Sequence, residues 1–175
     1  AGQVKKRKKD IIKMLENWDL KEGARFEVPT DDLHSSPAIL IRRKDANNLT
    51  FGFSLVTTRR LDAAETEAMN ALNHILNGTM SSRIFGEARR RGLVYGMGSG
   101  ISHSINYSSW DFDGEVNEDS AEELFDLIQH EMVKTLNGDI EESEIDAAKS
   151  YALGRYQMWA QTVNQISDYY AASYF

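Results

Sequence analysis

Apolar and polar residues alternate along two stretches of the chain, and each alternation predicts a strand that is covered on one face. In residues 49–55 the odd positions are apolar, at Leu49, Phe51, Phe53 and Leu55, and polar or small residues stand between them. Because successive side chains of a strand point to opposite faces, the apolar set must face a core. This stretch therefore predicts a strand at the surface of a layered domain.

The second alternation lies in residues 93–116, which are typical of two strands joined around residues 104–108. In the later strand the apolar positions are Trp110, Phe112 and Val116, and the acidic positions between them are Asp111, Asp113 and Glu115. We interpret the acidic face as a wet surface, although carboxylates in this arrangement could also bind a cation. A short apolar run at residues 38–41 predicts one more strand.

Helical periodicity and helix end signals place the first helices. Residues 5–17 have an apolar face and predict one helix. Asp62, followed three residues later by Glu65, is a capping-box signature and predicts the start of a second helix. That helix is expected to end at Asn77-Gly78, a typical C-terminal signal.

Two further helices follow the strands and complete the fold prediction. One is expected to begin near residues 118–120 and to end at Asn137-Gly138, and another runs from about Ile145 to the C-terminus. Strands and helices do not alternate strictly, which disfavours a doubly wound parallel sheet. The pattern predicts an α+β fold, with a mostly antiparallel sheet and helices packed on one face.

Composition narrows the classes of function. The 175 residues carry a net charge of −7, which argues against nucleic acid as a partner because phosphate neutralisation dominates that affinity. The basic runs Lys5–Lys9 and Arg89–Arg91 are short and separate, as is typical of solvated faces. Without cysteine, disulfides and thiolate metal sites are excluded. No apolar run approaches the roughly 18 residues of a membrane span and no signal-peptide core is seen, so the location stays open, cytoplasmic or periplasmic for a bacterial protein.

The most specific motif lies between Asn77-Gly78 and Tyr95. A polar turn with Ser81-Ser82-Arg83-Ile84-Phe85 is followed by a short basic helix that ends at Gly92, and a strand begins at Leu93-Val94. This order resembles the second domain of the pitrilysin, insulin-degrading enzyme and mitochondrial processing peptidase family of zinc peptidases. The corresponding stretch of that family reads roughly Leu-Gly-Gly-Gly-x-Ser-Ser-Arg-Leu-Phe-x-Glu-x-Arg-x-x-Arg-Gly-Leu-x-Tyr.

The resemblance implies roles for two residues of this motif. In the family, its arginine and tyrosine reach the zinc-bearing domain and help hold the substrate backbone or polarise the scissile carbonyl, and the match places these roles on Arg89 and Tyr95. The spacing to the tyrosine is one residue shorter than usual from Arg89, so Arg90 is the alternative arginine. Without the resemblance, Tyr95 would be a half-buried strand residue and the arginines a solvated helix end. Phe85 is expected in the core and Arg83 in a structural or surface role.

The zinc motif of the family, His-x-x-Glu-His, is absent from the chain. No two of its histidines are spaced four residues apart; they are His34, His74, His103 and His130. We therefore expect no metal ligand, no catalytic residue and no bound cofactor here, with Zn²⁺ in the parent enzyme held by a domain outside this chain. The implied function is that of the non-zinc-binding domain of a zinc-dependent endopeptidase, inactive when isolated. Its implied partners are the zinc-bearing domain, on the same chain or a partner subunit, and an unfolded peptide substrate.

The resemblance also implies a division of the chain and leaves one alternative. Residues 1–22 would be the end of a preceding domain or a linker helix, and residues 23–175 the second peptidase-family domain, which we expect to be cut at its C-terminus. The alternative is a catalytically inactive scaffold or substrate-recognition subunit of the same fold that partners an active peptidase. A retained arginine and tyrosine favour the enzyme.

Overall fold

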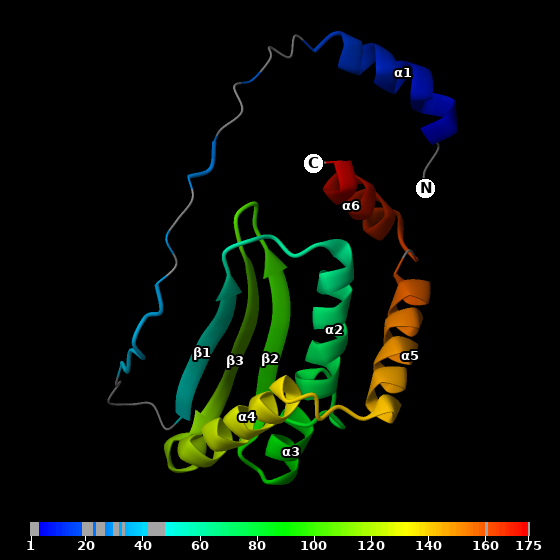
Figure 1. Cartoon of the computed structure of the whole chain (residues 1–175). Helices are drawn as coiled ribbons and strands as arrows, with labels where there is room; N and C mark the ends of the chain where they lie inside the picture. Colours follow the sequence, from blue (N-terminus) through cyan, green and yellow to red (C-terminus); the bar gives the residue numbers. More distant parts are fainter. Residues whose placement is uncertain are drawn as a thin grey trace. The chain divides into compact units, whose positions relative to one another are not determined.

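A computed structural model of the chain divides it into two compact units, one formed by Val28–Ser150 and the other by Ala1–Glu27 with Tyr151–Phe175. The structure describes residues 4–18, 23, 27–29, 32, 34–41, 48–159 and 161–174. Residues 48–150 of the first unit contain the sheet and the predicted site (Figure 1).

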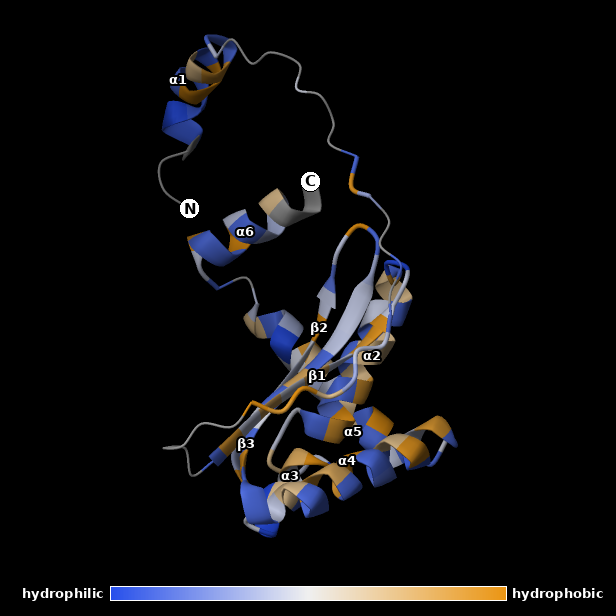
Figure 2. Ribbon diagram, turned by 90° about the vertical axis from the view of Figure 1, so that its left-hand side faces the viewer, coloured by the Kyte–Doolittle hydropathy of each residue, from blue (hydrophilic) through white to orange (hydrophobic). Residues whose placement is uncertain are grey.

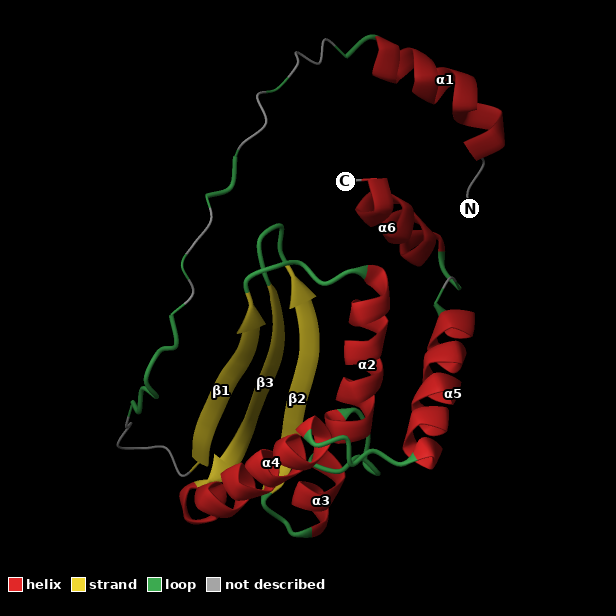
Figure 3. Cartoon of the chain, in the orientation of Figure 1, coloured by secondary structure: helices red, strands yellow, loops and turns green. Residues whose placement is uncertain are grey.

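The sheet has three antiparallel strands in the order β1-β3-β2 (Figure 3). They are β1 (Asn48–Thr57), β2 (Val94–His103) and β3 (Ser108–Asn117). β2 and β3 form a hairpin whose turn is closed by a hydrogen bond from the Ser104 amide to the Tyr107 carbonyl at 2.9 Å. β3 is therefore the central strand, with partners on both sides.

Three helices cover one face of this sheet. They are α2 (Ala63–Asn77), α3 (Phe85–Arg90) and α4 (Ala121–Leu136), the last preceded by a short 3₁₀ turn, η1 (Glu118–Ser120). The view along the sheet shows all three on the same side (Figure 2). The core between the layers contains Trp110, Phe112 and Val116 of β3, whereas Asp113 and Glu115 are exposed on the other face. The predicted α+β class and the predicted faces of β3 are both confirmed.

The start of α2 follows the predicted capping box. Asp62 Oδ1 accepts a hydrogen bond from the Glu65 amide at 2.8 Å, and Glu65 Oε2 accepts one from the Asp62 amide at 3.0 Å. Arg59 also donates to the Glu65 carboxylate, and this hydrogen bond is the main reason that the pKa of Glu65 falls to about 2. The capping box thus gives hydrogen-bond acceptors to two backbone N–H groups at the helix start, those of Asp62 and Glu65, which would otherwise be unpaired.

Two predicted elements differ from the structure. The strand expected at residues 38–41 is wrong, because residues 34–41 have no regular secondary structure and β1 pairs only with β3 among the described strands. The single long helix from about Ile145 is also wrong, since it is divided into α5 (Glu142–Met158) and α6 (Val163–Tyr174).

The break between α5 and α6 has a local cause. The Gln165 side chain accepts hydrogen bonds from the Gln161 and Thr162 amides at 3.2 and 3.0 Å, and Thr162 Oγ1 accepts one from the Gln165 amide at 3.2 Å. This is the reciprocal arrangement of a capping box, Thr-x-x-Gln, which starts a new helix. The helix predicted at residues 5–17 is confirmed as α1 (Val4–Glu16). No described helix has the length and apolar character needed to cross a membrane.

A polar network lies under the sheet and joins it to α2. Asn73 Oδ1 accepts hydrogen bonds from Ser99 Oγ at 2.6 Å and from Trp110 Nε1 at 2.7 Å. Asn77 Nδ2 donates to Ser99 Oγ at 2.9 Å. One amide oxygen of α2 thus satisfies donors from both β2 and β3, which aligns the helix with the hairpin.

We expect Asn73→Ala to lower the free energy of unfolding by about 1–3 kcal/mol, because the buried Trp110 indole N–H loses its acceptor. Urea denaturation followed by circular dichroism measures the change. Asn70→Ala is the matched control, since Asn70 is an exposed residue of the same helix. Equal stability of the two variants would contradict a role for the network.

Candidate functional site

Tyr95 is the second residue of β2 and lies three residues after Gly92, which is in the turn that follows α3. Gly92 has a φ of +72°, a conformation that favours glycine, and the Leu93 amide then donates to the Ala88 carbonyl at 2.9 Å. Leu93 and Val94 are each 5% exposed and anchor the start of β2, whereas Tyr95 is 90% exposed. The backbone at Tyr95 is therefore fixed by the core while its side chain is presented to solvent, and the alternative of a half-buried tyrosine is wrong.

A bulge of the sheet lies at the same place. The pairing of β2 with β3 passes from Val94 opposite Val116 to Met97 opposite Gly114, so the register shifts between Val94 and Met97. Bulges of this kind re-aim side chains and are common beside functional sites. Tyr95 lies in this irregular segment, which the alternation of the sequence does not reveal.

Arg89, on the last turn of α3, meets Tyr95. Its Nη1 donates to the Tyr95 carbonyl oxygen at 2.8 Å, and its Cζ lies 5.1 Å from the centroid of the Tyr95 ring. That distance is within the range of a cation–π contact. The structure thus brings together the two residues that the sequence predicts as a pair, and each restrains the other.

Two shallow hollows meet at Tyr95. The first, of 420 Å³, is lined by Thr50, Tyr95, Gly96, Met97, Gly98, Asp113, Gly114 and Glu115. The second, of 290 Å³, is lined by Asn48, Arg89, Gly92, Leu93, Val94, Tyr95, Glu115, Val116 and Asn117. Tyr95 and Glu115 belong to both. A ligand in either hollow would contact the tyrosine, and one in the second would also contact Arg89.

Arg89 and Arg90 differ in what they contact. Arg90 donates from Nε to Glu87 Oε2 at 3.0 Å and from Nη2 to the same oxygen. It lines neither of the two hollows beside Tyr95. Arg90 is thus paired to a carboxylate on its own helix, whereas Arg89 contacts Tyr95.

Arg83 of the same motif links several elements of the fold. Its Nε and Nη2 donate to the two oxygens of Glu144 at 2.6 and 2.5 Å, and its Nη1 donates to the Asp139 carbonyl at 2.7 Å. Nη1 also lies 3.6 Å from Glu131 Oε2. One guanidinium therefore joins the turn before α3 to α4, to the α4–α5 loop and to the start of α5. Phe85, predicted in the core, packs against the core cluster.

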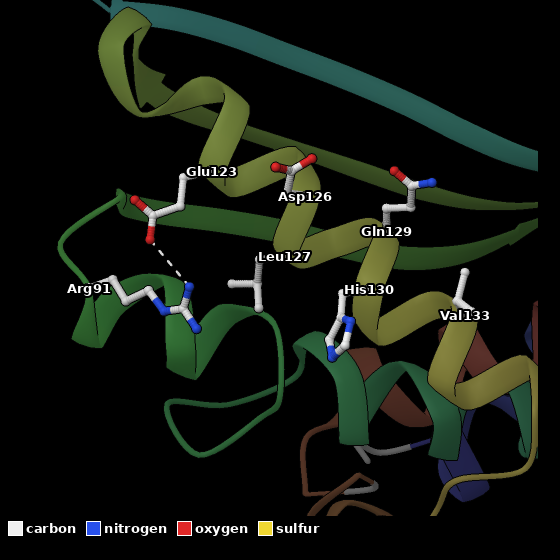
Figure 4. A pocket seen from close by; sticks show the side chains of 7 residues that line it. All are labelled: Arg91, Glu123, Asp126, Leu127, Gln129, His130 and Val133. Carbon is white, nitrogen blue, oxygen red and sulfur yellow. Dashed lines mark hydrogen bonds and ion pairs between the residues drawn. The ribbon is translucent and has the colours of Figure 1, made fainter.

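A third hollow lies between α3 and α4 and is not apparent from the sequence (Figure 4). It measures 610 Å³ and is lined by Arg91, Glu123, Asp126, Leu127, Gln129, His130 and Val133. Figure 4 shows Arg91, the residue that follows α3, reaching toward Glu123 on α4, and their ion pair spans 3.2 Å. The helix spacing from Glu123 to Val133 places these side chains along one helix, but only the tertiary structure brings Arg91 to them.

The described residues contain no group of three or more His, Cys, Asp or Glu side chains that could hold a metal ion. The histidines do not gather: His74 lies on α2, His103 ends β2 and His130 lies on α4. His103 Nδ1 is 2.9 Å from Ser108 Oγ, and its Nε2 is 3.3 Å from Thr66 Oγ1. These contacts tie the hairpin to α2 and supply no ligand set for zinc.

The fold and the site together define a class of protein, an antiparallel α+β domain with an arginine–tyrosine pair at the start of a strand and no metal site among its described residues. A sequence profile described as the peptidase M16 inactive domain matches residues 3–151. The chain therefore belongs to the peptidase M16 inactive-domain family. The resemblance to the non-zinc-binding second domain of pitrilysin-family peptidases is confirmed.

Solved structures with the same fold include a peptidase M16 inactive domain from Pseudomonas fluorescens, with a TM-score of 0.57, 23% identity and coverage of 64% of this chain and 27% of that chain. A protease from Helicobacter pylori has a TM-score of 0.61 and 16% identity, covering 74% and 32%. The periplasmic protease PqqL from Escherichia coli has a TM-score of 0.65 and 14% identity, covering 92% and 18%.

The chain thus spans between about a fifth and a third of the length of these three structures, and their similarity extends to the fold. A comparison with curated protein sequences gave no match.

We expect Glu144→Gln to lower the free energy of unfolding by about 1.5–3 kcal/mol at neutral pH, the range for a hydrogen bond to a charged group. The Arg83 hydrogen bond is the main cause that holds the pKa of Glu144 below its ordinary value near 4.5. The stabilisation is therefore complete above that value and is lost as the pH falls through the lower pKa of the folded state. Urea denaturation at neutral and acidic pH measures the difference from the wild type, which must shrink in acid. Glu142→Gln is the control, because this exposed residue of the same first turn has the same favourable interaction with the helix dipole but no hydrogen bond to Arg83, and its replacement must cost clearly less stability than Glu144→Gln.

Proposed function

We propose that this domain holds an unfolded peptide beside the zinc-bearing domain of a metalloendopeptidase. The observation that carries the proposal is the contact of Arg89 with the exposed Tyr95 where two hollows meet. Membership of the M16 inactive-domain family supports it. Because the described residues offer no zinc ligands, the proposal assigns zinc to the other domain and assigns only substrate holding to this chain.

The chemistry of the two side chains suits a peptide backbone. A guanidinium carries five N–H donors in a fixed fork, and a phenol can donate to a carbonyl oxygen or to the negative charge that develops on it. Only one Arg89 donor, on Nη1, is accounted for by the Tyr95 carbonyl. We propose that the remaining donors and the Tyr95 hydroxyl contact carbonyl oxygens of the bound peptide.

The sheet offers a second contribution to peptide binding. β2 pairs with β3 on one side only among the described strands, and Tyr95 is near the start of β2. An extended peptide can add to an open strand edge through main-chain hydrogen bonds, with little demand on its sequence. This mode of binding would explain how a peptidase accepts unfolded substrates of many sequences.

We expect Tyr95→Phe in the complete protein to reduce kcat/KM for an unstructured peptide by roughly three- to tenfold, which is the worth of one hydrogen bond. The ring and its contact with Arg89 would be kept, so the loss reports on the hydroxyl. Steady-state cleavage of a fluorogenic peptide measures it. Tyr107→Phe is the matched control, because Tyr107 is an exposed tyrosine of the β2–β3 turn. An unchanged kcat/KM for Tyr95→Phe would contradict the proposal.

The isolated chain is expected to retain no stoichiometric zinc and to cleave no unstructured peptide, since it contributes holding residues alone. Metal analysis after gel filtration and a peptide-cleavage assay test this, with the complete protein as the positive control. Cleavage by the isolated chain would overturn the assignment of chemistry to another domain.

A further inference from the structure

Glu87 of α3 pairs with two of the three consecutive arginines, Arg89–Arg91, that lie at the end of this helix and just after it. Its Oε2 accepts from Arg90 Nε at 3.0 Å and also from Arg90 Nη2, and its Oε1 accepts from Arg91 Nε at 2.7 Å. Arg91 Nη1 is also 3.2 Å from Glu123 Oε1 on α4. Both carboxylate oxygens of Glu87 are therefore occupied, and neither by Arg89.

Of these three arginines, Arg89 is the one without a carboxylate partner among the described residues. Within the part of the chain that the structure describes, no carboxylate lies at salt-bridge distance from Arg89. Its hydrogen bond goes to the uncharged Tyr95 carbonyl, and its guanidinium lies over the Tyr95 ring. The positive charge beside Tyr95 is thus not cancelled by an ion pair.

Without Glu87, the guanidinium groups of Arg89, Arg90 and Arg91 would compete for the position beside Tyr95. Arginine side chains are long, and neighbouring guanidiniums at the end of a six-residue helix repel one another and reorient when the carboxylate between them is lost. A released Arg90, or an Arg91 that is held by Glu123 alone, could displace Arg89 or offer a bound peptide a second, misplaced donor fork. The Arg90 and Arg91 hydrogen bonds lower the pKa of Glu87, so its carboxylate is charged at neutral pH.

We propose that Glu87 is a positioning residue, which holds Arg90 and Arg91 away from Tyr95 so that Arg89 alone faces the ligand. Glu87 acts through the arginines and does not itself touch the peptide. The proposal rests on the proposed function, because it explains how one arginine of three is selected for peptide holding.

The test measures the affinity of the complete protein for a fluorescein-labelled, unstructured casein peptide by fluorescence anisotropy, with a chelator present to prevent cleavage. We expect Glu87→Gln to weaken binding about two- to fivefold, the scale of one exposed ion pair. We expect Glu87→Gln combined with Arg90→Gln and Arg91→Gln to restore the affinity to within about twofold of the wild type. A merely structural role of Glu87 would not be reversed by removing two more charged side chains.

Two further variants separate the possible failures. Arg89→Gln tests the proposed function itself. If this variant binds the peptide as well as the wild type does, or if the wild type does not bind, then peptide holding at this site is wrong. The positioning role of Glu87, which rests on it, is then wrong as well. If Arg89→Gln weakens binding but Glu87→Gln does not, or if the triple variant is not restored, only the role of Glu87 is overturned. Glu123→Gln removes the other partner of Arg91 and must leave affinity unchanged, and thermal unfolding of every variant checks folding.

Discussion

The central strand β3 must place its apolar side chains against the helices and its carboxylates in water, and the rest of the domain follows from that requirement. Phe112 stacks on Phe53 of β1 with ring centroids 4.9 Å apart, and Trp110 lies at the same distance from Phe112. A shift of one residue in the pairing would turn Asp111 and Asp113 into this core. Burying carboxylates without partners costs far more than the domain can offset, so a single register is stable.

The position of Tyr95 is a consequence of that register. Val94 lies opposite Val116 at the buried end of the hairpin, and α3 reaches this point through Gly92 and the buried Leu93. The bulge between Val94 and Met97 then interrupts the alternation of inward and outward side chains, and the next residue, Tyr95, is exposed. An exposed side chain that follows buried residues and whose ring meets Arg89 is well suited to contact a ligand, because less conformational entropy remains to be lost on binding.

Alternation of apolar and polar residues and local helix-capping motifs were sufficient to predict much of the fold from the sequence. Alternation identified β1 and β3, and the Asp62 capping box identified the start of α2. The strand expected at residues 38–41 fails because an apolar run carries no information on whether a partner strand is present. The division of the C-terminal helix had a local signal, the Thr162–Gln165 capping box, which the apolar and aromatic character of the surrounding residues obscured.

The site was predictable in part, for a different reason. Motif resemblance selected Arg89 and Tyr95, and helix spacing could have revealed that Glu87 lies three and four residues before two arginines. The contact of Arg89 with the Tyr95 ring, and the two hollows that Tyr95 lines, depend on the bulge and on Gly92. Such features arise from three-dimensional packing and leave no periodic trace in the sequence.

The arginines of residues 81–95 are chemically identical, and they differ in the groups that surround them. Arg83 is largely buried, and its guanidinium is met by the Glu144 carboxylate, a backbone carbonyl and a nearby Glu131, so little donor capacity remains for a ligand. Arg89 is partly exposed, meets one carbonyl and has no carboxylate partner among the described residues. An ion pair that is already formed must be broken before a ligand can use it, whereas an unpaired guanidinium needs only to lose water. Which arginine of this basic motif lacks a carboxylate partner among the described residues is therefore set by where the acidic residues lie, and they lie beside Arg83, Arg90 and Arg91.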